Sequence, residues 1–144
     1  MIKKILVPID LSRPDVCEEA VSEAIKLADF HGASLHFVSV MPGFGMPVVG
    51  SFFTQEQTDQ ASREFARAFL KFLKDCDLDK HPHSIAVGKA WEGIVNTAKK
   101  VDADLIVMNH HARSRPGGTA LIGSCTQQVA ERSPCSVYLI KPRK

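Results

Sequence analysis

The chain alternates short, almost continuous apolar runs with longer stretches in which apolar residues recur every three or four positions. A continuous run bounded by turn residues is typical of a parallel strand covered on both faces, and the longer spacing is typical of an amphipathic helix. The spacing predicts one helix in each interval between runs. The runs predict five strands, at residues 4–9, 35–40, 84–87, 104–108 and 136–140.

Local signals mark the ends of these helices. The pattern S-x-x-D at residues 12–15 predicts the start of the first helix, with a proline in its first turn, and Gly32 predicts its end. The pattern T-x-x-Q at residues 54–57 predicts the start of the second helix. The third helix begins near Trp91, and the fourth is expected over residues 119–132.

The element order is therefore strand and helix four times, followed by a last strand. Such alternation indicates an α/β fold, a doubly wound domain in which helices cover both faces of a parallel sheet. The 144 residues, of which 44% are hydrophobic, suit one compact core, and we expect a single domain over residues 1–144.

Charge and composition exclude several classes of function. The 18 basic and 16 acidic residues give a formal net charge of only +2, so neither nucleic acid nor a membrane surface is expected as a partner. The apolar runs are too short to span a bilayer. The brief apolar stretch before Asp10 does not resemble a secretory signal, which favours a cytoplasmic protein. The four cysteines lack C-x-x-C spacing, and no metal site is expected.

Candidate chemistry is expected after the strands, because ligands of open parallel sheets bind beyond the carboxyl ends where the strand order reverses. The fingerprints G-x-G-x-x-G, G-x-x-x-x-G-K-[ST] and G-x-S-x-G are all absent. What remains is an anion site at Gly123-Ser124, near a helix start that offers free backbone N–H groups and the positive end of the helix dipole. Ser124 and Thr126 add hydroxyls, and Arg113 adds charge.

Two further positions suit a nucleoside. Asp10, at the end of the first strand, can accept hydrogen bonds from a ribose diol, and the backbone after Val40 can meet an adenine edge. Asp10 equally suits a capping role at the first helix. Spacing alone leaves both interpretations open.

The opening KKILVPIDLS and the C-terminal stretch from GKAWEGIV to CSVYLIK resemble the universal stress protein family over essentially the whole chain. The resemblance implies a five-stranded parallel sheet of order 3-2-1-4-5, with the site between the ends of strands one and four. The apolar loop at residues 41–53 is similar to that of the small bacterial members that bind ATP. The implied ligand is ATP or another adenine nucleotide, with any Mg²⁺ carried on its phosphates.

The resemblance also implies which residues form the site. The adenosine side would comprise Pro8, Ile9, Asp10 and Val40. The ribose and first phosphate would meet Met108, Asn109, His111, Ala112 and the charge of Arg113. The remaining phosphates would meet Gly123, Ser124, Cys125 through its backbone N–H, and Thr126.

One motif departs from the family. ATP-binding members carry G-x-x-G, nine residues, then G-S/T. Here Asn109 and Ala112 replace both early glycines, and ten residues, 113–122, precede Gly123-Ser124. Asn tolerates positive φ, whereas the Ala112 methyl group could cost about 1–2 kcal/mol where a phosphate passes. We favour retained but modified nucleotide binding.

Two alternatives stay open: a nucleotide-free dimeric signalling or interaction module with a degenerate motif, and a different ligand such as AMP, a cyclic nucleotide or another phosphate compound. No general base is evident, so no catalytic residue is assigned and at most slow ATP hydrolysis is expected. The last strand, Ser136–Ile140, would be an apolar edge that invites pairing, and the resemblance implies a homodimer through it.

Overall fold

The sheet of this protein is parallel and five-stranded in the computed structural model, which describes residues 1–43, 55–110, 112–114 and 120–141. The strand order is β3-β2-β1-β4-β7, which confirms the expected order 3-2-1-4-5. Successive strands are added on one side of β1 up to β3 and on its other side from β4 onward, so the order reverses between β1 and β4. The strands are β1 (Lys4–Pro8), β2 (Ser34–Met41), β3 (His83–Val87), β4 (Leu105–Asn109) and β7 (Ser136–Ile140).

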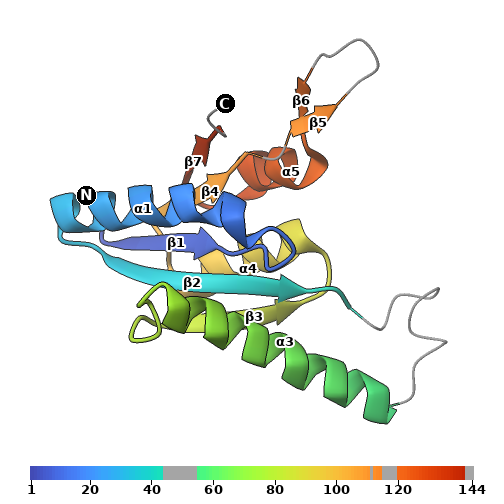
Figure 1. The fold of residues 1–144 in the computed structure, drawn as a ribbon. Coiled ribbons are helices and arrows are strands. Elements are labelled where there is room, and N and C mark those ends of the chain that lie inside the picture. The colour runs from blue at the N-terminus through green and yellow to red at the C-terminus, as the bar shows by residue number, and fades with distance from the viewer. Residues whose placement is uncertain (44–54, 111, 115–119, 142–144) are drawn as a thin grey trace.

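Helices cover both faces of this sheet (Figure 1). On one face lie α1 (Pro14–His31) and α3 (Gln55–Asp75), which share an apolar cluster. On the other face lie α4 (Ala90–Val101) and α5 (Ser124–Arg132) with a second cluster. The described helices on both faces confirm the doubly wound α/β architecture.

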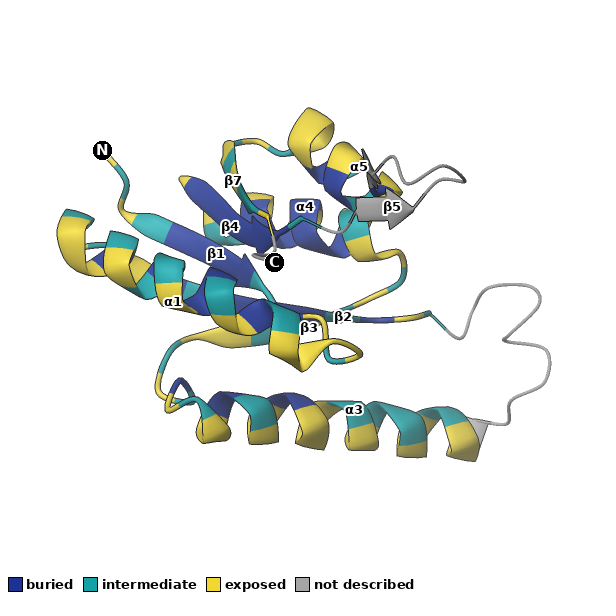
Figure 2. Ribbon diagram, turned by 45° about the horizontal axis from the view of Figure 1, so that its top comes forward, coloured by how far each residue is buried: buried dark blue, intermediate teal, exposed yellow. Residues whose placement is uncertain are grey.

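The apolar run in β1 is continuous because both of its faces are buried. Ile5 and Val7 contribute to the cluster beneath α1 and α3, whereas Leu6 contributes to the cluster beneath α4 and α5. All three side chains are 0% exposed. Alternate residues of a strand point to opposite faces, so a central strand needs apolar residues at every position. Figure 2 shows the resulting buried centre of the sheet.

Helix α1 begins at Pro14, within the predicted start and with the expected proline in its first turn, but the expected serine cap is absent. Arg13 is the N-cap residue and makes no side-chain capping bond, so Ser12 does not cap the helix. Instead the Ser12 backbone N–H donates to Asp10 Oδ1 at 3.0 Å, and the Ser12 hydroxyl donates to the same oxygen. The Asp10 carboxylate therefore binds Ser12 in the turn that precedes the helix. The predicted end is confirmed, because Gly32 at φ 67° closes α1 with its N–H on Ala28 O.

A hairpin interrupts what the sequence predicts as a loop and the start of the fourth helix. β5 (Ala112–Ser114) and β6 (Ala120–Ile122) pair antiparallel, with Ala112 opposite Ile122. Helix α5 therefore begins at Ser124 and not near residue 119. The run at residues 120–122 fits the periodicity of α5, but its backbone pairs with β5. Residues 54 and 119, which open two predicted helices, lie outside the described residues.

Among the helices in the described ranges, none combines the length and apolar character needed to cross a bilayer.

Candidate functional site

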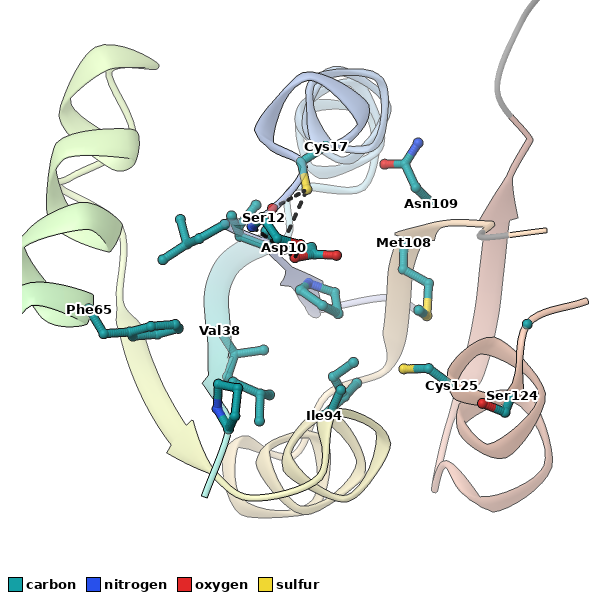
Figure 3. Close-up of a pocket in the computed structure, with 17 residues that line it drawn as sticks. Asp10, Ser12, Cys17, Val38, Phe65, Ile94, Met108, Asn109, Ser124 and Cys125 are labelled. Carbon is teal, nitrogen blue, oxygen red and sulfur yellow. Dashed lines mark hydrogen bonds between the residues drawn. The ribbon is translucent and has the colours of Figure 1, made fainter. Parts of the chain in front are cut away.

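A cavity of about 530 Å³ opens at the carboxyl ends of β1, β2 and β4, where the strand order reverses (Figure 3). This is the position expected for ligand sites in open α/β sheets. Nine of the residues expected from the sequence line it: Pro8, Ile9, Asp10, Val40, Met108, Asn109, Gly123, Ser124 and Cys125.

The remaining expected residues are placed differently. Thr126 is fully buried and is not among the lining residues. Ala112 and Arg113 belong to β5 through their backbone, and their side chains are outside the described part of the chain. His111 lies outside the described residues altogether.

One end of the cavity is apolar. Its lining includes Val38 and Val40 of β2, Phe65 of α3 and Ile94 of α4. This apolar end, called the apolar slot below, suits an aromatic ring system. The sequence misses Phe65 and Ile94 as site residues, because helical periodicity marks them as core positions and does not show which core residues border a cavity.

Gly93 sets how closely α4 approaches this slot. A Cβ atom built at Gly93 would lie 2.7 and 2.9 Å from the two Cγ atoms of Val40, and 3.0 Å from Ala86 Cβ. Contacts this short are forbidden for real side chains, so only glycine allows α4 to lie directly on β2 and β3 here. The close approach brings Ile94 to the floor of the cavity, next to Val40.

Asp10 stands at the mouth of the cavity, one residue beyond a buried Ile9. Its Oδ1 atom accepts two hydrogen bonds from Ser12, whereas Oδ2 has no protein partner in the described part of the chain. Its backbone N–H donates to Cys17 Sγ at 3.2 Å. Hydrogen bonds to Ser12 and to Cys17 therefore both hold this turn. The other carboxylate oxygen is available to accept a hydrogen bond from a ligand.

The Cys17 thiol has a structural role in this turn. It is 4% exposed, and burial raises its pKa to about 11. The thiol therefore stays protonated near neutral pH and is a poor nucleophile. Its contribution is to accept the Asp10 N–H and so hold the turn that presents the carboxylate.

The opposite wall is the start of α5. Gly123 precedes the helix in an extended conformation (φ −64°, ψ 153°), and no side chain caps the helix. The first backbone bond back to this end is from Gln127 N–H to Gly123 O. The preceding N–H groups, at residues 124–126, therefore point out of the helix with the positive end of its dipole. This arrangement can hold an anion at Gly123-Ser124, as the sequence predicts.

Cys125 adds a half-buried thiol to this wall, facing Met108 (Figure 3). Burial raises the pKa of the Cys125 thiol, and the Asp10 carboxylate across the cavity raises it further. Asp10 and Cys125 both line the cavity, one at the end of β1 and the other in the first turn of α5.

Two buried polar side chains have no hydrogen-bond partner among the described residues. Asn109 is 5% exposed, and both its Oδ1 and its Nδ2 are unpaired; Thr126 is 0% exposed, and its Oγ1 is unpaired. An unsatisfied buried group costs about 1–3 kcal/mol, so native proteins rarely leave one without a reason. Asn109 lines the cavity, where a ligand could supply the missing partners.

Metal-binding groups do not gather in the described part of the chain, since no cluster of three or more His, Cys, Asp or Glu side chains occurs there.

The sheet order, with a crevice at its reversal point, defines a doubly wound α/β domain. The family model of the universal stress protein family matches residues 1–141. The chain belongs to the universal stress protein family.

Solved structures of the same fold include the universal stress protein UspA from Lactobacillus plantarum, at 26% identity and a TM-score of 0.67, covering 96% of this chain and 97% of that one. A universal stress protein in complex with cAMP matches at 20% identity and a TM-score of 0.69, covering 96% and 97%. The universal stress protein from Archaeoglobus fulgidus in complex with dAMP matches at 22% identity and a TM-score of 0.58, covering 98% and 100%.

Proposed function

We propose that this chain is a cytoplasmic stress-response protein that binds ATP or a related adenine nucleotide in the cavity between β1 and β4. The observation that carries the proposal is the order in which three kinds of chemical group follow one another along one cavity. An apolar slot lies at the β2 end, a carboxylate stands at the end of β1, and an uncapped helix start lies beyond β4. Base, ribose and phosphates follow one another in the same order.

The dimensions agree with this assignment. β2 and β4 are separated by β1, so their ends lie two strand spacings apart, roughly 10 Å. That span suits an adenosine laid across the sheet ends, with the ring against Val40 and the ribose near Asp10. The phosphates then reach the N–H groups at Gly123-Ser124. The cAMP and dAMP complexes of family members support an adenine nucleotide as the ligand class.

The bound nucleotide acts in this proposal as a regulatory ligand. Asp10, the one carboxylate among the described lining residues, is bonded to Ser12. In the proposed pose it meets the ribose and lies away from the terminal phosphate. A Mg²⁺ ion, where present, would shield the phosphate charge and would be held by phosphate oxygens. We expect ATP turnover below about 1 s⁻¹, the low end of usual enzyme rates.

Isothermal titration calorimetry with ATP tests the proposal. We expect saturable binding with one site per chain at submillimolar nucleotide. The second candidate function, a nucleotide-free interaction module, is favoured by Asn109 and Ala112 at the two early glycine positions of the motif. It predicts no binding heat even at millimolar ATP, ADP or AMP, so the same titration separates the two.

The ligand would regulate a homodimer in this proposal. β7 is an edge strand, paired only with β4 among the described strands. Its Tyr138 is 40% exposed, and its other apolar residues are half-buried. An open apolar edge is a template for pairing with a second chain. The end of β7 lies beside the site, because Ile140 is opposite Asn109 in the sheet.

A further inference from the structure

The Asn109 side chain is a feature of this chain that nucleotide binding in general does not explain. Its amide is 95% buried, lines the cavity and has no partner for either polar atom among the described residues. An amide oxygen accepts hydrogen bonds, and an amide nitrogen donates them. Whatever satisfies Asn109 must therefore offer both a donor and an acceptor.

The position of Asn109 restricts which part of a ligand can form hydrogen bonds with its amide. β1 and β4 are neighbours, with Leu6 opposite Ile106. Three residues further along, this register places Asn109 beside Ile9, directly before Asp10. In Figure 3 Asn109 projects from the end of β4 on the side of α1, whereas Met108 projects to the other side, toward Cys125. The amide is thus on the side of the α1 turn that holds Asp10.

A phosphate does not fit this position. At neutral pH its oxygens offer acceptors only, which leaves Asn109 Oδ1 unsatisfied, and the nearby Asp10 carboxylate would repel it. An aromatic base edge is expected at the β2 end of the cavity, two strands away. A pair of adjacent hydroxyls offers both donors and acceptors, carries no charge and can also donate to the free Oδ2 atom of Asp10.

We propose that the buried Asn109 amide and the Asp10 carboxylate both form hydrogen bonds with the vicinal diol of the ligand. Asn109 is then a specificity-determining residue for ribonucleotides. The inference rests on the proposed nucleotide function and deepens it. The asparagine that replaces a motif glycine then supplies a contact that glycine cannot make.

The test is a thermodynamic cycle with three ligands: ATP, 2′-deoxy-ATP and 3′-deoxy-ATP. Each Kd is measured by calorimetry for the wild type and for Asn109→Leu, which keeps the size of the side chain and removes its polar atoms. We expect Asn109→Leu to weaken ATP about tenfold, the scale of one neutral hydrogen bond. The deoxy analogue that lacks the hydroxyl read by Asn109 already binds weakly, so its Kd should change less than about twofold.

Two controls accompany the cycle. Asn96→Leu makes the same chemical change at an exposed asparagine of α4 that does not line this cavity, and it should leave all three Kd values unchanged. The ligand-free melting temperature of Asn109→Leu should rise, because an apolar group replaces an unsatisfied amide of similar shape. If Asn109→Leu does not fold, Asn109→Ala is used in the same cycle.

The outcomes separate the two proposals. An equal loss for all three ligands, or no loss for any, overturns the role of Asn109 and leaves nucleotide binding standing. If wild-type protein binds none of the three at millimolar concentration, the proposed function fails and the inference fails with it. A loss confined to ligands that carry one particular hydroxyl supports both.

Discussion

At the scale of single residues, the site depends on atoms left free by local hydrogen bonding. Asp10 accepts the Ser12 N–H through Oδ1, its Oδ2 has no partner among the described residues, and Cys17 accepts the Asp10 backbone N–H. The sequence leaves two roles open for Asp10, ribose binding and helix capping. The structure places its carboxylate on the turn before α1 and not at the N-cap, and it keeps Asp10 at the cavity. Side-chain hydrogen bonding of this kind cannot be read from residue spacing.

Asp10→Asn is expected to weaken ATP binding by about tenfold or more. The amide keeps an oxygen for the Ser12 donors but replaces Oδ2 with an NH₂ group, which cannot accept a hydrogen bond from a hydroxyl, and bonds to charged groups are the stronger ones. Calorimetry gives the Kd. Asp29→Asn, at an exposed position near the far end of α1, is the matched control and should bind like the wild type. Equal affinity for both variants would remove Asp10 from the site.

Alkylation of Cys125 is expected to report on the occupied cavity. Burial raises the pKa of its thiol, so its thiolate fraction at pH 8 is below that of a free cysteine and keeps rising above pH 9. Iodoacetamide labelling, followed by mass spectrometry, should therefore accelerate with pH and slow several-fold with saturating ATP. Cys135, outside the cavity, is the internal reference. Equal labelling of Cys125 with and without ATP would contradict a ligand at α5.

At the scale of elements, the sequence predicts much of the fold. A short continuous apolar run such as that of β1 favours a strand covered on both faces, and the order of elements then restricts the topology. The hairpin of β5 and β6 is missed, because three-residue strands have no periodicity of their own. The start of α5 is misplaced for the same reason, since Ala120–Ile122 fits a helical stripe equally well.

Gly93→Ala tests the close approach of α4 to β2. An alanine in an open helix position would stabilise the chain by up to about 1 kcal/mol, whereas here the added methyl group collides with Val40. We expect the free energy of unfolding to fall by about 1–3 kcal/mol, as for other overpacked cores. Urea denaturation measures the change. Asn96→Ala on the exposed side of α4 is the control, and a stabilised Gly93→Ala variant would show that α4 can move.

At the scale of the whole molecule, both outer strands of the sheet expose apolar side chains. Tyr138 on β7 is 40% exposed, and Val87 on β3 is 62% exposed. Sequence indicates the apolar character of β7 but cannot show which edge is covered by another chain. The fold, and nine residues that line the cavity, could be predicted from the sequence and its family resemblance. The apolar wall residues from α3 and α4 could not, because only the packing of whole elements brings them to the cavity.

Tyr138→Lys is expected to convert the proposed dimer to a monomer. Antiparallel pairing of Ser136–Ile140 about a two-fold axis brings the two central residues together, and like charges directly opposite each other destabilise paired strands. Analytical ultracentrifugation measures the mass. Val87→Lys adds the same charge to the other edge strand and should stay dimeric. A wild-type monomer, or loss of the dimer in the Val87 variant alone, would contradict pairing through β7.

The residues that line the cavity come from distant parts of the chain, among them Asp10, Val40, Ile94 and Ser124. A ligand bound there contacts both the N-terminal and the C-terminal half of the chain and so stabilises their association. Ligand at a hundred times its Kd adds about 2.7 kcal/mol to the folded state. The lifetime of the protein against heat and proteases would then follow the nucleotide concentration around it, so its abundance could register the energy supply without any catalytic step.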